Sequence, residues 1–261
     1  MTHARGHADV AGGIPRDLDA PTVVIAHGAW IDATGWREVI ALLQFKGVNV
    51  VAVQNPLTSL ADDVDAVSRA INQLSGPVVL VGHGYGGTVI TQAGNHSRVA
   101  ALVYVAAFAP DSGECTMDSQ MEYPPREAVA KLEVDSSGFL YLAQESVSQF
   151  LAQDLPATDN RVLAATQQPI RVGALVDRVA VAAWRAKPCW YVVTSEDRMI
   201  SPSLQRQLAA TMNAHVSTMR AGHTPFLSKP KETADVILTA VDFVLQKGGL
   251  LWYSIAGTLP M

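Results

Sequence analysis

Residues Pro77 to Ile90 read PVVLVGHGYGGTVI. The run of valine and leucine, bounded by turn residues, is typical of a strand that is buried on both faces of a parallel sheet. The glycine-rich residues 82–87 predict a tight turn, and the pattern after them predicts a helix over about 86–96. The stretch therefore predicts a strand, a sharp turn and a helix, in that order, within an α/β fold.

Apolar runs alternate with helical patterns on both sides of this stretch. Short runs rich in valine and other strand-forming residues predict five further strands, at 22–27, 48–53, 99–107, 189–194 and 214–219. Apolar residues at helical spacing predict helices at about 31–46, 59–74, 201–213 and 231–246. This alternation predicts a doubly wound, mostly parallel α/β sheet with right-handed crossovers. Ligands of such sheets bind beyond the carboxyl ends of the strands, which is where each motif below lies.

The strand pattern stops between about 110 and 187. Prolines and a Ser-Ser-Gly run separate several short helical pieces there. We expect a single α/β domain over 21–261, in which this segment is a helical insertion between the fourth and fifth strands. Residues 1–20 lack the apolar core of a secretory signal, and we expect them to be a flexible lead-in.

The composition limits the classes of function. With 49% hydrophobic and 16% charged residues, the chain of 261 residues is expected to be globular. The net charge is −5 and the basic residues are scattered, which argues against a nucleic-acid partner. Cys115 and Cys189 form neither a disulfide framework nor a zinc-binding spacing, and we expect no metal and no cofactor.

The C-terminal run GGLLWYSIAGTLPM is apolar, but it is shorter than the roughly 20 residues that a membrane span needs. We therefore expect no membrane span and a cytoplasmic protein. The run is expected to dock on its own domain, and a contact between the subunits of a homodimer is the alternative.

The turn after the strand quoted first, Gly82-His83-Gly84-Tyr85-Gly86, has the frame G-x-S-x-G. In that frame a serine nucleophile stands on a strained turn between a strand and a helix. Gly84 occupies the serine position, where glycine adopts a positive φ easily but supplies no nucleophile. A nucleotide-binding turn is the alternative, although the run lacks a Walker lysine and no acidic residue ends the next predicted strand. His83 is expected to be structural.

A second motif, His27-Gly28-Ala29-Trp30, follows the first predicted strand. The backbone N–H of a small residue after His-Gly can bind an oxyanion together with the N–H that follows the nucleophile position. Ala29 and Tyr85 are the residues that carry these two N–H groups. The sequence therefore predicts an oxyanion hole formed by Ala29 and Tyr85.

Asp197 and His223 follow the last two predicted strands. The order of elbow, acid and histidine is a known chain order for a catalytic triad. The carboxylate would orient the imidazole, and the imidazole would act first as a base and then as an acid. Glu196 and Asp111 also lie close to strand ends, and each is an alternative to Asp197.

Together these motifs resemble those of short bacterial esterases of the α/β-hydrolase fold, which are related to plant methyl-ester esterases and hydroxynitrile lyases. The segments that carry the likeness are VIAHGAWIDATGWREVI, VVAVQNPLTSLADDV, VVLVGHGYGG, LVYVAAFAPDSGE, YVVTSEDRMISPSLQ and GHTPFLSKP, between about residues 22 and 246. The resemblance implies that the insertion at about 110–187 is a helical cap over the site. It also implies that Asp197 and His223 are two members of a triad. Gly84 departs from the family pattern, which has a serine there.

Three explanations of Gly84 are open. The nucleophile of an ordinary serine esterase has been replaced deliberately, or a natural enzyme works without a covalent intermediate. In the second case His223 is a general base for an elimination, a carbon–carbon cleavage, a cyclisation or a water-mediated hydrolysis. The third explanation is a ligand-binding protein without catalytic activity.

Aromatic residues near strand ends or in the insertion suggest the nature of the pocket. With Tyr85, they are Trp30, Phe108, Tyr141, Trp184 and Phe226. Ordinary core packing is the alternative for each of them. Together they predict an apolar pocket for a small apolar or aromatic substrate.

Overall fold

A computed structural model describes residues 20–121, 123 and 131–256, without the side chains of residues 120, 121 and 248–256. Its centre is a six-stranded sheet in the order β2-β1-β3-β4-β8-β9, in which every neighbouring pair is parallel. The strands are β1 Thr22–Ala26, β2 Asn49–Val53, β3 Val78–Gly84, β4 Val99–Ala107, β8 Cys189–Thr194 and β9 His215–Met219. All six predicted strands are therefore present, and the prediction of a doubly wound parallel sheet is confirmed.

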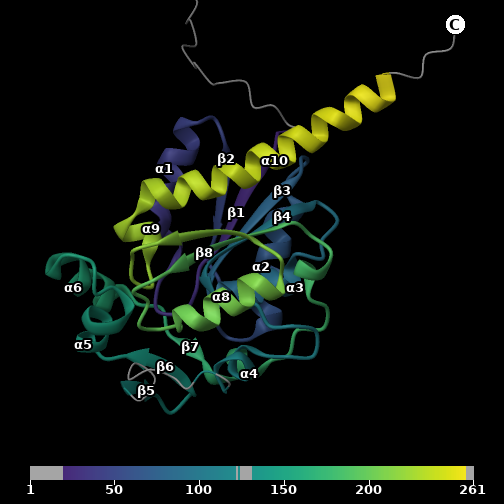
Figure 1. The fold of residues 1–261 in the computed structure, drawn as a ribbon. Helices are drawn as coiled ribbons and strands as arrows, with labels where there is room; N and C mark the ends of the chain where they lie inside the picture. Colours follow the sequence, from purple (N-terminus) through teal and green to yellow (C-terminus); the bar gives the residue numbers. More distant parts are fainter. Residues whose placement is uncertain (1–19, 122, 124–130, 257–261) are drawn as a thin grey trace, which may run out of the picture.

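Helices cover both faces of this sheet (Figure 1). Val23 and Ile25 of β1 face an apolar core beneath helices α1 and α10, whereas Val24 faces a second core beneath α2 and α3. The helices of this layer arrangement are α1 Arg37–Phe45, α2 Leu60–Asn72, α3 Gly86–Ala93, α8 Pro202–Thr211, α9 Pro225–Ser228 and α10 Pro230–Ala256, with a 3₁₀ turn η1 at Ala33–Trp36. Burial on both faces explains why the four inner strands, β1, β3, β4 and β8, are continuous apolar runs rather than alternating ones.

Local sequence signals set the helix ends. The side chain of Ser59 accepts a hydrogen bond from the N–H of Asp62 at the start of α2, and two aspartates lie in its first turn, where the helix dipole favours negative charge. Pro202 occupies the first turn of α8 after the cap residue Ser201. Gly47 follows α1 with φ of +80°, a conformation that favours glycine.

The segment between β4 and β8 contains helices and a small sheet. Its helical elements are α4 Thr116–Met121, α5 Gln144–Ser146, η3 Val147–Leu151, α6 Ala157–Thr166, α7 Val172–Val176 and η4 Ala183–Arg185. Three short strands, β5 Leu132–Val134, β6 Phe139–Leu142 and β7 Ile170–Arg171, form a separate antiparallel sheet. The sequence predicted helices alone here, because strands of this length are too short to show an alternating pattern.

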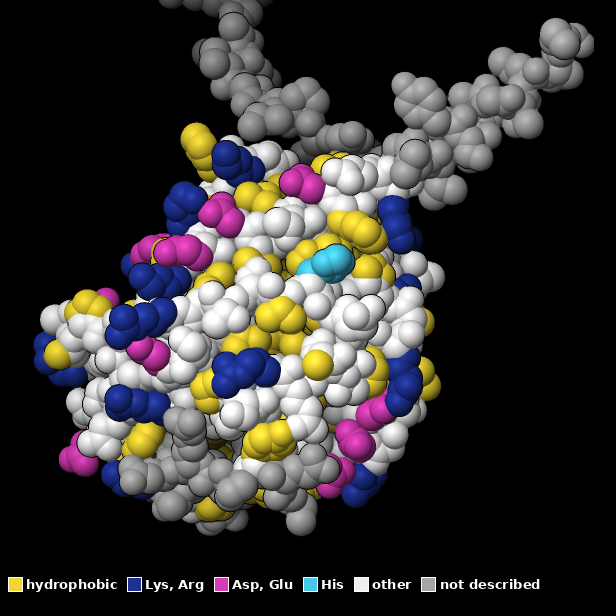
Figure 2. All heavy atoms as spheres, in the orientation of Figure 1, with side chains coloured by type: hydrophobic (Ala, Val, Ile, Leu, Met, Phe, Trp, Pro, Cys, Tyr) yellow, Lys and Arg dark blue, Asp and Glu magenta, His cyan; other side chains and the backbone are white. Residues whose placement is uncertain are grey.

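The ends of the chain lie partly outside the described residues. The backbone of α10 is helical to Ala256, but the side chains of the apolar C-terminal run are not described, so docking of this run and its role in a homodimer stay predictions. Most of the expected lead-in, residues 1–19, also lies outside the described part. In the part of the chain that the structure covers, no helix has the length and apolarity to cross a membrane. Figure 2 shows basic, acidic and apolar side chains interspersed over one face.

Candidate active site

The turn between β3 and α3 places Gly84 opposite His223. Gly84 has φ of +54°, the left-handed conformation expected at the elbow. A Cβ atom added to Gly84 would lie 3.2 Å from His223 Nε2 and 3.9 Å from Gly28 Cα. A side chain at position 84 would therefore be in direct contact with the imidazole.

Neighbouring glycines let α3 pack tightly at this corner. A Cβ on Gly86 would lie 2.3 Å from the carbonyl oxygen of Ala26, and a Cβ on Gly87 would lie 2.1 Å from that of Phe108. Both distances are far shorter than van der Waals contact, so the backbones can approach only because these residues lack side chains. The start of α3 is thereby held against the ends of β1 and β4.

His223 lies in the loop between β9 and α9, and only 4% of its surface is exposed. Its Nδ1 donates a hydrogen bond to Asp197 Oδ2 over 2.9 Å. The Nε2 atom consequently carries the free lone pair, and it is the atom nearest to the Cβ position of Gly84. This is the orientation that a general base at the elbow requires.

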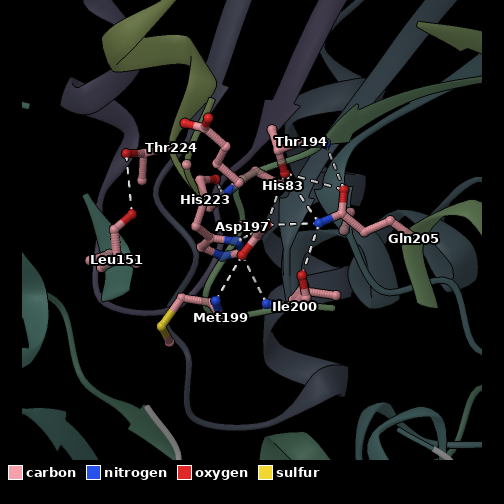
Figure 3. A network of polar contacts seen from close by, with 12 residues as sticks. His83, Leu151, Thr194, Asp197, Met199, Ile200, Gln205, His223 and Thr224 are labelled. Atoms are coloured by element: carbon pink, nitrogen blue, oxygen red, sulfur yellow. Dashed lines mark hydrogen bonds and ion pairs between the residues drawn. The ribbon is translucent and has the colours of Figure 1, made fainter. Parts of the chain in front are cut away.

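Asp197 is fully buried and has four further hydrogen-bond donors (Figure 3). The backbone N–H groups of Met199 and Ile200 donate to Oδ1 at 2.8 and 2.9 Å. Thr194 Oγ1 and Gln205 Nε2 donate to Oδ2 at 2.9 and 2.8 Å. A carboxylate removed from water needs such donors, and here they also fix the oxygen that holds His223.

The two alternative acids point elsewhere. Glu196 forms an ion pair with Arg220, and Asp111 forms one with Arg185, both at the surface. Among the acidic residues that the sequence suggested, Asp197 is the one that the structure brings to His223. Sequence reasoning missed Thr194 and Gln205, since neither belongs to a motif.

His83 lies beneath His223 and supports its backbone. Its Nε2 donates to the carbonyl oxygen of His223 at 2.8 Å, and the two rings lie 4.5 Å apart, centroid to centroid. Burial is the main reason why the pKa of His83 is well below its usual value, so the ring is neutral. These contacts agree with a structural role rather than one in proton transfer.

Ala29 and Tyr85 both lie next to the elbow, because Tyr85 follows Gly84 in the chain and Ala29 follows Gly28, which packs against Gly84. Ala29 and Tyr85 line the same cavity as Gly84 and His223. Within the described residues, neither N–H donates a hydrogen bond to a protein acceptor. Buried N–H groups without an acceptor are rare, and a pair of them beside a base can stabilise an oxyanion.

A cavity of about 360 Å³ opens in front of these groups, with walls from the sheet end and from the inserted segment. Among the described residues, the side chains that line it are largely apolar, and none of these is an acid, a lysine or an arginine. Besides Ala29, Gly84, Tyr85 and His223, they are Trp30, Phe108, Thr116, Met117, Leu132, Val134, Leu140, Val172, Leu175, Val176, Met199 and Ile200.

The polar side chains of this lining are mostly engaged already. Trp30 Nε1 donates to the Leu140 carbonyl, Tyr85 donates its hydroxyl to Asp63, and Thr116 pairs with Thr88. Within the described lining, His223 Nε2 and the two backbone N–H groups are therefore the polar groups that a ligand can use. Across the described ranges, no group of three or more His, Cys, Asp or Glu side chains could hold a metal ion.

Of the five aromatic residues proposed as substrate contacts, Trp30 and Phe108 line the cavity. Phe226 is fully buried and stacks on Trp36, with ring centroids 4.2 Å apart. Trp184 is buried against the core and donates its indole N–H to the carbonyl of Pro110. Tyr141 lies on β6 outside the lining. These three residues therefore lie outside the described lining of this cavity, and their role as substrate contacts stays a prediction.

Comparisons with known proteins identify the family of this chain. The sequence matches the profile of the alpha/beta hydrolase family over residues 23–236. It is 25% identical over 245 residues to the probable hydrolase R7 of Phoma sp., which covers 84% of this chain and 98% of that protein. It is 24% identical over 254 residues to the putative methylesterase 11, chloroplastic, of Arabidopsis thaliana, covering 85% of this chain and 64% of that protein.

Solved structures share the fold. Polyneuridine aldehyde esterase superposes with a TM-score of 0.76 at 17% sequence identity, covering 85% of this chain and 99% of that chain. At this level of identity the likeness concerns the fold alone.

Proposed function

This chain belongs to the alpha/beta hydrolase family, and from that premise we propose that it is a carboxylic-ester hydrolase in which His223 acts without a serine nucleophile. The observation that supports this function best is the position of His223 Nε2. It faces the Cβ position of Gly84 at 3.2 Å, while Asp197 holds the other ring nitrogen. The base is thus oriented as in a triad although the nucleophile is missing.

Water is the nucleophile in this proposal. His223 Nε2 accepts a proton from a water molecule as its oxygen attacks the ester carbonyl carbon. The N–H groups of Ala29 and Tyr85 stabilise the resulting oxyanion. The bond from carbon to the alcohol oxygen then breaks, the imidazolium returns its proton to the leaving alcohol, and the acid product is released.

The expected rate is low. Removing a triad nucleophile typically lowers kcat about 10⁶-fold and leaves about 10³- to 10⁴-fold acceleration over water from binding and the oxyanion hole. Direct attack by water on a bound ester would fall in this residual range. The proposal therefore predicts slow hydrolysis by the unaltered chain.

The substrate in this proposal is a small, neutral, apolar or aromatic ester. The described lining of the cavity supports this class, because it contains no acidic side chain, lysine or arginine. We also propose that the inserted segment at about 110–187 is a cap over the site, since it supplies much of the wall. A cytoplasmic location stays a prediction.

The test is the hydrolysis of p-nitrophenyl acetate and butyrate by the unaltered chain, Gly84→Ser and Gly84→Ala. We expect Gly84→Ser to raise kcat by several orders of magnitude, because the base and the oxyanion donors are already in place. Gly84→Ala carries the same backbone strain without a hydroxyl, so it should gain nothing. Adding His223→Ala to Gly84→Ser should abolish the gain.

Two results would contradict the proposal. If Gly84→Ser folds but hydrolyses no faster than Gly84→Ala, the site is not built for acyl transfer. If His223→Ala leaves the gain intact, the base lies elsewhere. Either result would favour a ligand-binding protein or a different reaction based on His223. The next step would then be a screen for small molecules that raise the Tm of the chain.

A further inference from the structure

The peptide groups on both sides of Ala29 are held by hydrogen bonds. His27 Nδ1 lies 2.9 Å from the carbonyl oxygen of Gly28. The N–H of Trp30 donates to the carbonyl oxygen of Gln168 at 2.8 Å. The Ala29 N–H shares a planar trans peptide with the Gly28 carbonyl, so the two groups point in opposite directions. Fixing the Gly28 oxygen therefore fixes the direction of the Ala29 N–H.

His27 can hold this carbonyl in one tautomer only. A carbonyl oxygen accepts hydrogen bonds, so Nδ1 must carry the proton. Its Nε2 accepts from the backbone N–H of Asn55 at 2.9 Å, which requires a free lone pair. The amide of Asn55 also donates to the His27 carbonyl at 2.9 Å. Burial lowers the pKa of His27, which agrees with a neutral ring.

Gln168 contacts both Trp30 and Asn55, and it thereby connects the two sets of hydrogen bonds on either side of Ala29. Its backbone oxygen holds Trp30, and its side-chain Nε2 donates to the carbonyl of Asn55 at 2.7 Å. A closed ring of contacts thus runs from Gln168 through Asn55 and His27 to the Gly28–Trp30 segment and back. The Ala29 N–H lies on this ring but takes no part in its hydrogen bonds.

Other contacts seat the inserted segment on the same loops. The N–H of Arg171 donates to the carbonyl of Leu57 at 2.9 Å, and Trp30 Nε1 donates to the carbonyl of Leu140 at 3.0 Å. Trp30 has φ of +62°, a conformation that costs a bulky residue energy. The surrounding contacts stabilise that conformation, and two of them come from the insertion.

We propose that Gln168 is a positioning residue, through which the inserted segment aligns the Ala29 N–H for the oxyanion. This inference rests on the proposed function, since it assumes an oxyanion at Ala29 and Tyr85. Gln168 itself touches no reacting atom. Its side chain acts through Asn55 and His27, and its backbone acts through Trp30.

The test compares binding of an anion with binding of a neutral molecule of the same shape. Phenyl methylphosphonate carries a tetrahedral oxyanion, whereas phenyl methanesulfonate is its neutral counterpart. Affinities are measured by calorimetry at one pH for the unaltered chain, Gln168→Ala and Gln168→Glu. The glutamate keeps the size of the side chain but cannot donate to the Asn55 carbonyl.

Gln167→Ala is the matched control. Gln167 is adjacent and also makes side-chain hydrogen bonds, but its partners are Leu142 and Ala164 inside the insertion. Its loss should affect stability without reaching the Ala29 loop. A general weakening of the insertion would therefore appear in Gln167→Ala as well.

We expect both Gln168 variants to bind the phosphonate roughly fivefold to tenfold more weakly, the range for one lost hydrogen bond. The affinity of the two Gln168 variants for the sulfonate should be unchanged. Gln167→Ala should bind both the phosphonate and the sulfonate as tightly as the unaltered chain does. If the phosphonate binds the Gln168 variants as tightly as the unaltered chain, or if Gln167→Ala loses as much, the positioning role is wrong while the proposed function stands. If the unaltered chain shows no preference for the phosphonate, there is no oxyanion site, and both proposals fail.

Discussion

Asp63 is a buried carboxyl group in the packing that supports the elbow. It accepts a hydrogen bond from the Tyr85 hydroxyl at 2.9 Å and one from the N–H of Leu57 at 2.7 Å. Burial, the largest effect, raises the pKa of Asp63 from 3.8 to about 6, although both hydrogen bonds act to lower it. Two donors therefore do not compensate for the loss of water around this carboxylate.

The raised pKa of Asp63 predicts how stability depends on pH. The folded chain binds more protons than the unfolded chain between the two pKa values, so the free energy of unfolding falls as pH rises through that window. Asp63→Asn removes this effect. The free energy of unfolding of the variant, minus that of the unaltered chain, should therefore rise by about 2 kcal/mol from about pH 4.5 to about pH 7.5.

Urea unfolding of both proteins at the two pH values measures this difference. Asp65→Asn is the control, because Asp65 is an exposed aspartate on the same helix. The same pH dependence in Asp63→Asn and the unaltered chain would mean that Asp63 is ionised at little cost.

At the level of residues, the sequence predicted which groups meet but not what holds them. Gly84, Asp197 and His223 could be found because each follows a strand, and parallel strands end at one edge of the sheet. Gln205 and Gln168 could not be found in this way. Their roles depend on side-chain and backbone contacts between distant segments, and a lone glutamine gives no local pattern.

The corner between β3 and α3 is the element on which the site depends most. Here Gly87 lies against the backbone of β4, where a Cβ would be 2.1 Å from the Phe108 carbonyl oxygen. The nearest atoms belong to the backbone of Phe108 and to the Cβ of Ala107, so no flexible end of a side chain could move away. Gly87→Ala should therefore lower the free energy of unfolding by about 3 kcal/mol or more, the upper range for overpacking.

Gly173→Ala is the control for the alanine itself. Gly173 lies in α7, and a Cβ added there would meet no atom within 4 Å beyond its chain neighbours and the backbone of its own helix. Alanine there should be neutral or stabilise by up to about 1 kcal/mol, because it favours the helix. Equal unfolding free energies for the two variants would show that α3 can shift away from β4 easily.

Elements differed in how well their sequences predicted them. The four inner strands of the large sheet are buried apolar runs bounded by turns, whereas the edge strands β2 and β9 are partly exposed and were predicted from their place in the alternation with helices. Strands β5, β6 and β7 have two to four residues each, and β7 pairs with a strand nearly 30 positions earlier. Their formation depends on contacts within the insertion, which a window on the sequence does not contain.

At the scale of the whole molecule, the cavity belongs to two parts of the chain. The sheet end supplies Gly84, His223 and the N–H donors, and the insertion supplies apolar walls such as Leu140 and Val176. Membership of the alpha/beta hydrolase family could be recognised from the motifs, and the profile match confirms it. The lining could be recognised only in part: Trp30 and Phe108 line the cavity as predicted, whereas Phe226 is in the core, because aromatic residues fill a core as readily as a pocket.

The apolar lining predicts strong selection against charge on the acyl chain. We expect Gly84→Ser to hydrolyse p-nitrophenyl butyrate with a kcat/KM at least about 100-fold above that for p-nitrophenyl hemisuccinate. The hemisuccinate would bury a terminal carboxylate, away from the oxyanion donors, against walls whose described residues include no lysine or arginine. Both esters have the same leaving group, so their ratio reports the acyl part of the pocket.

A lysine in the wall should reduce this selection. Val176 lines the cavity and is half exposed, so Val176→Lys can keep its ammonium group hydrated in the absence of substrate. In the Gly84→Ser background it should raise kcat/KM for the hemisuccinate and leave the value for the butyrate within a few fold. Equal kcat/KM for the two esters before this change would mean that the acyl chain does not enter the cavity. If the lysine changes neither value, the acyl chain lies against another wall of the cavity, because a charge at Val176 acts only on groups near that residue.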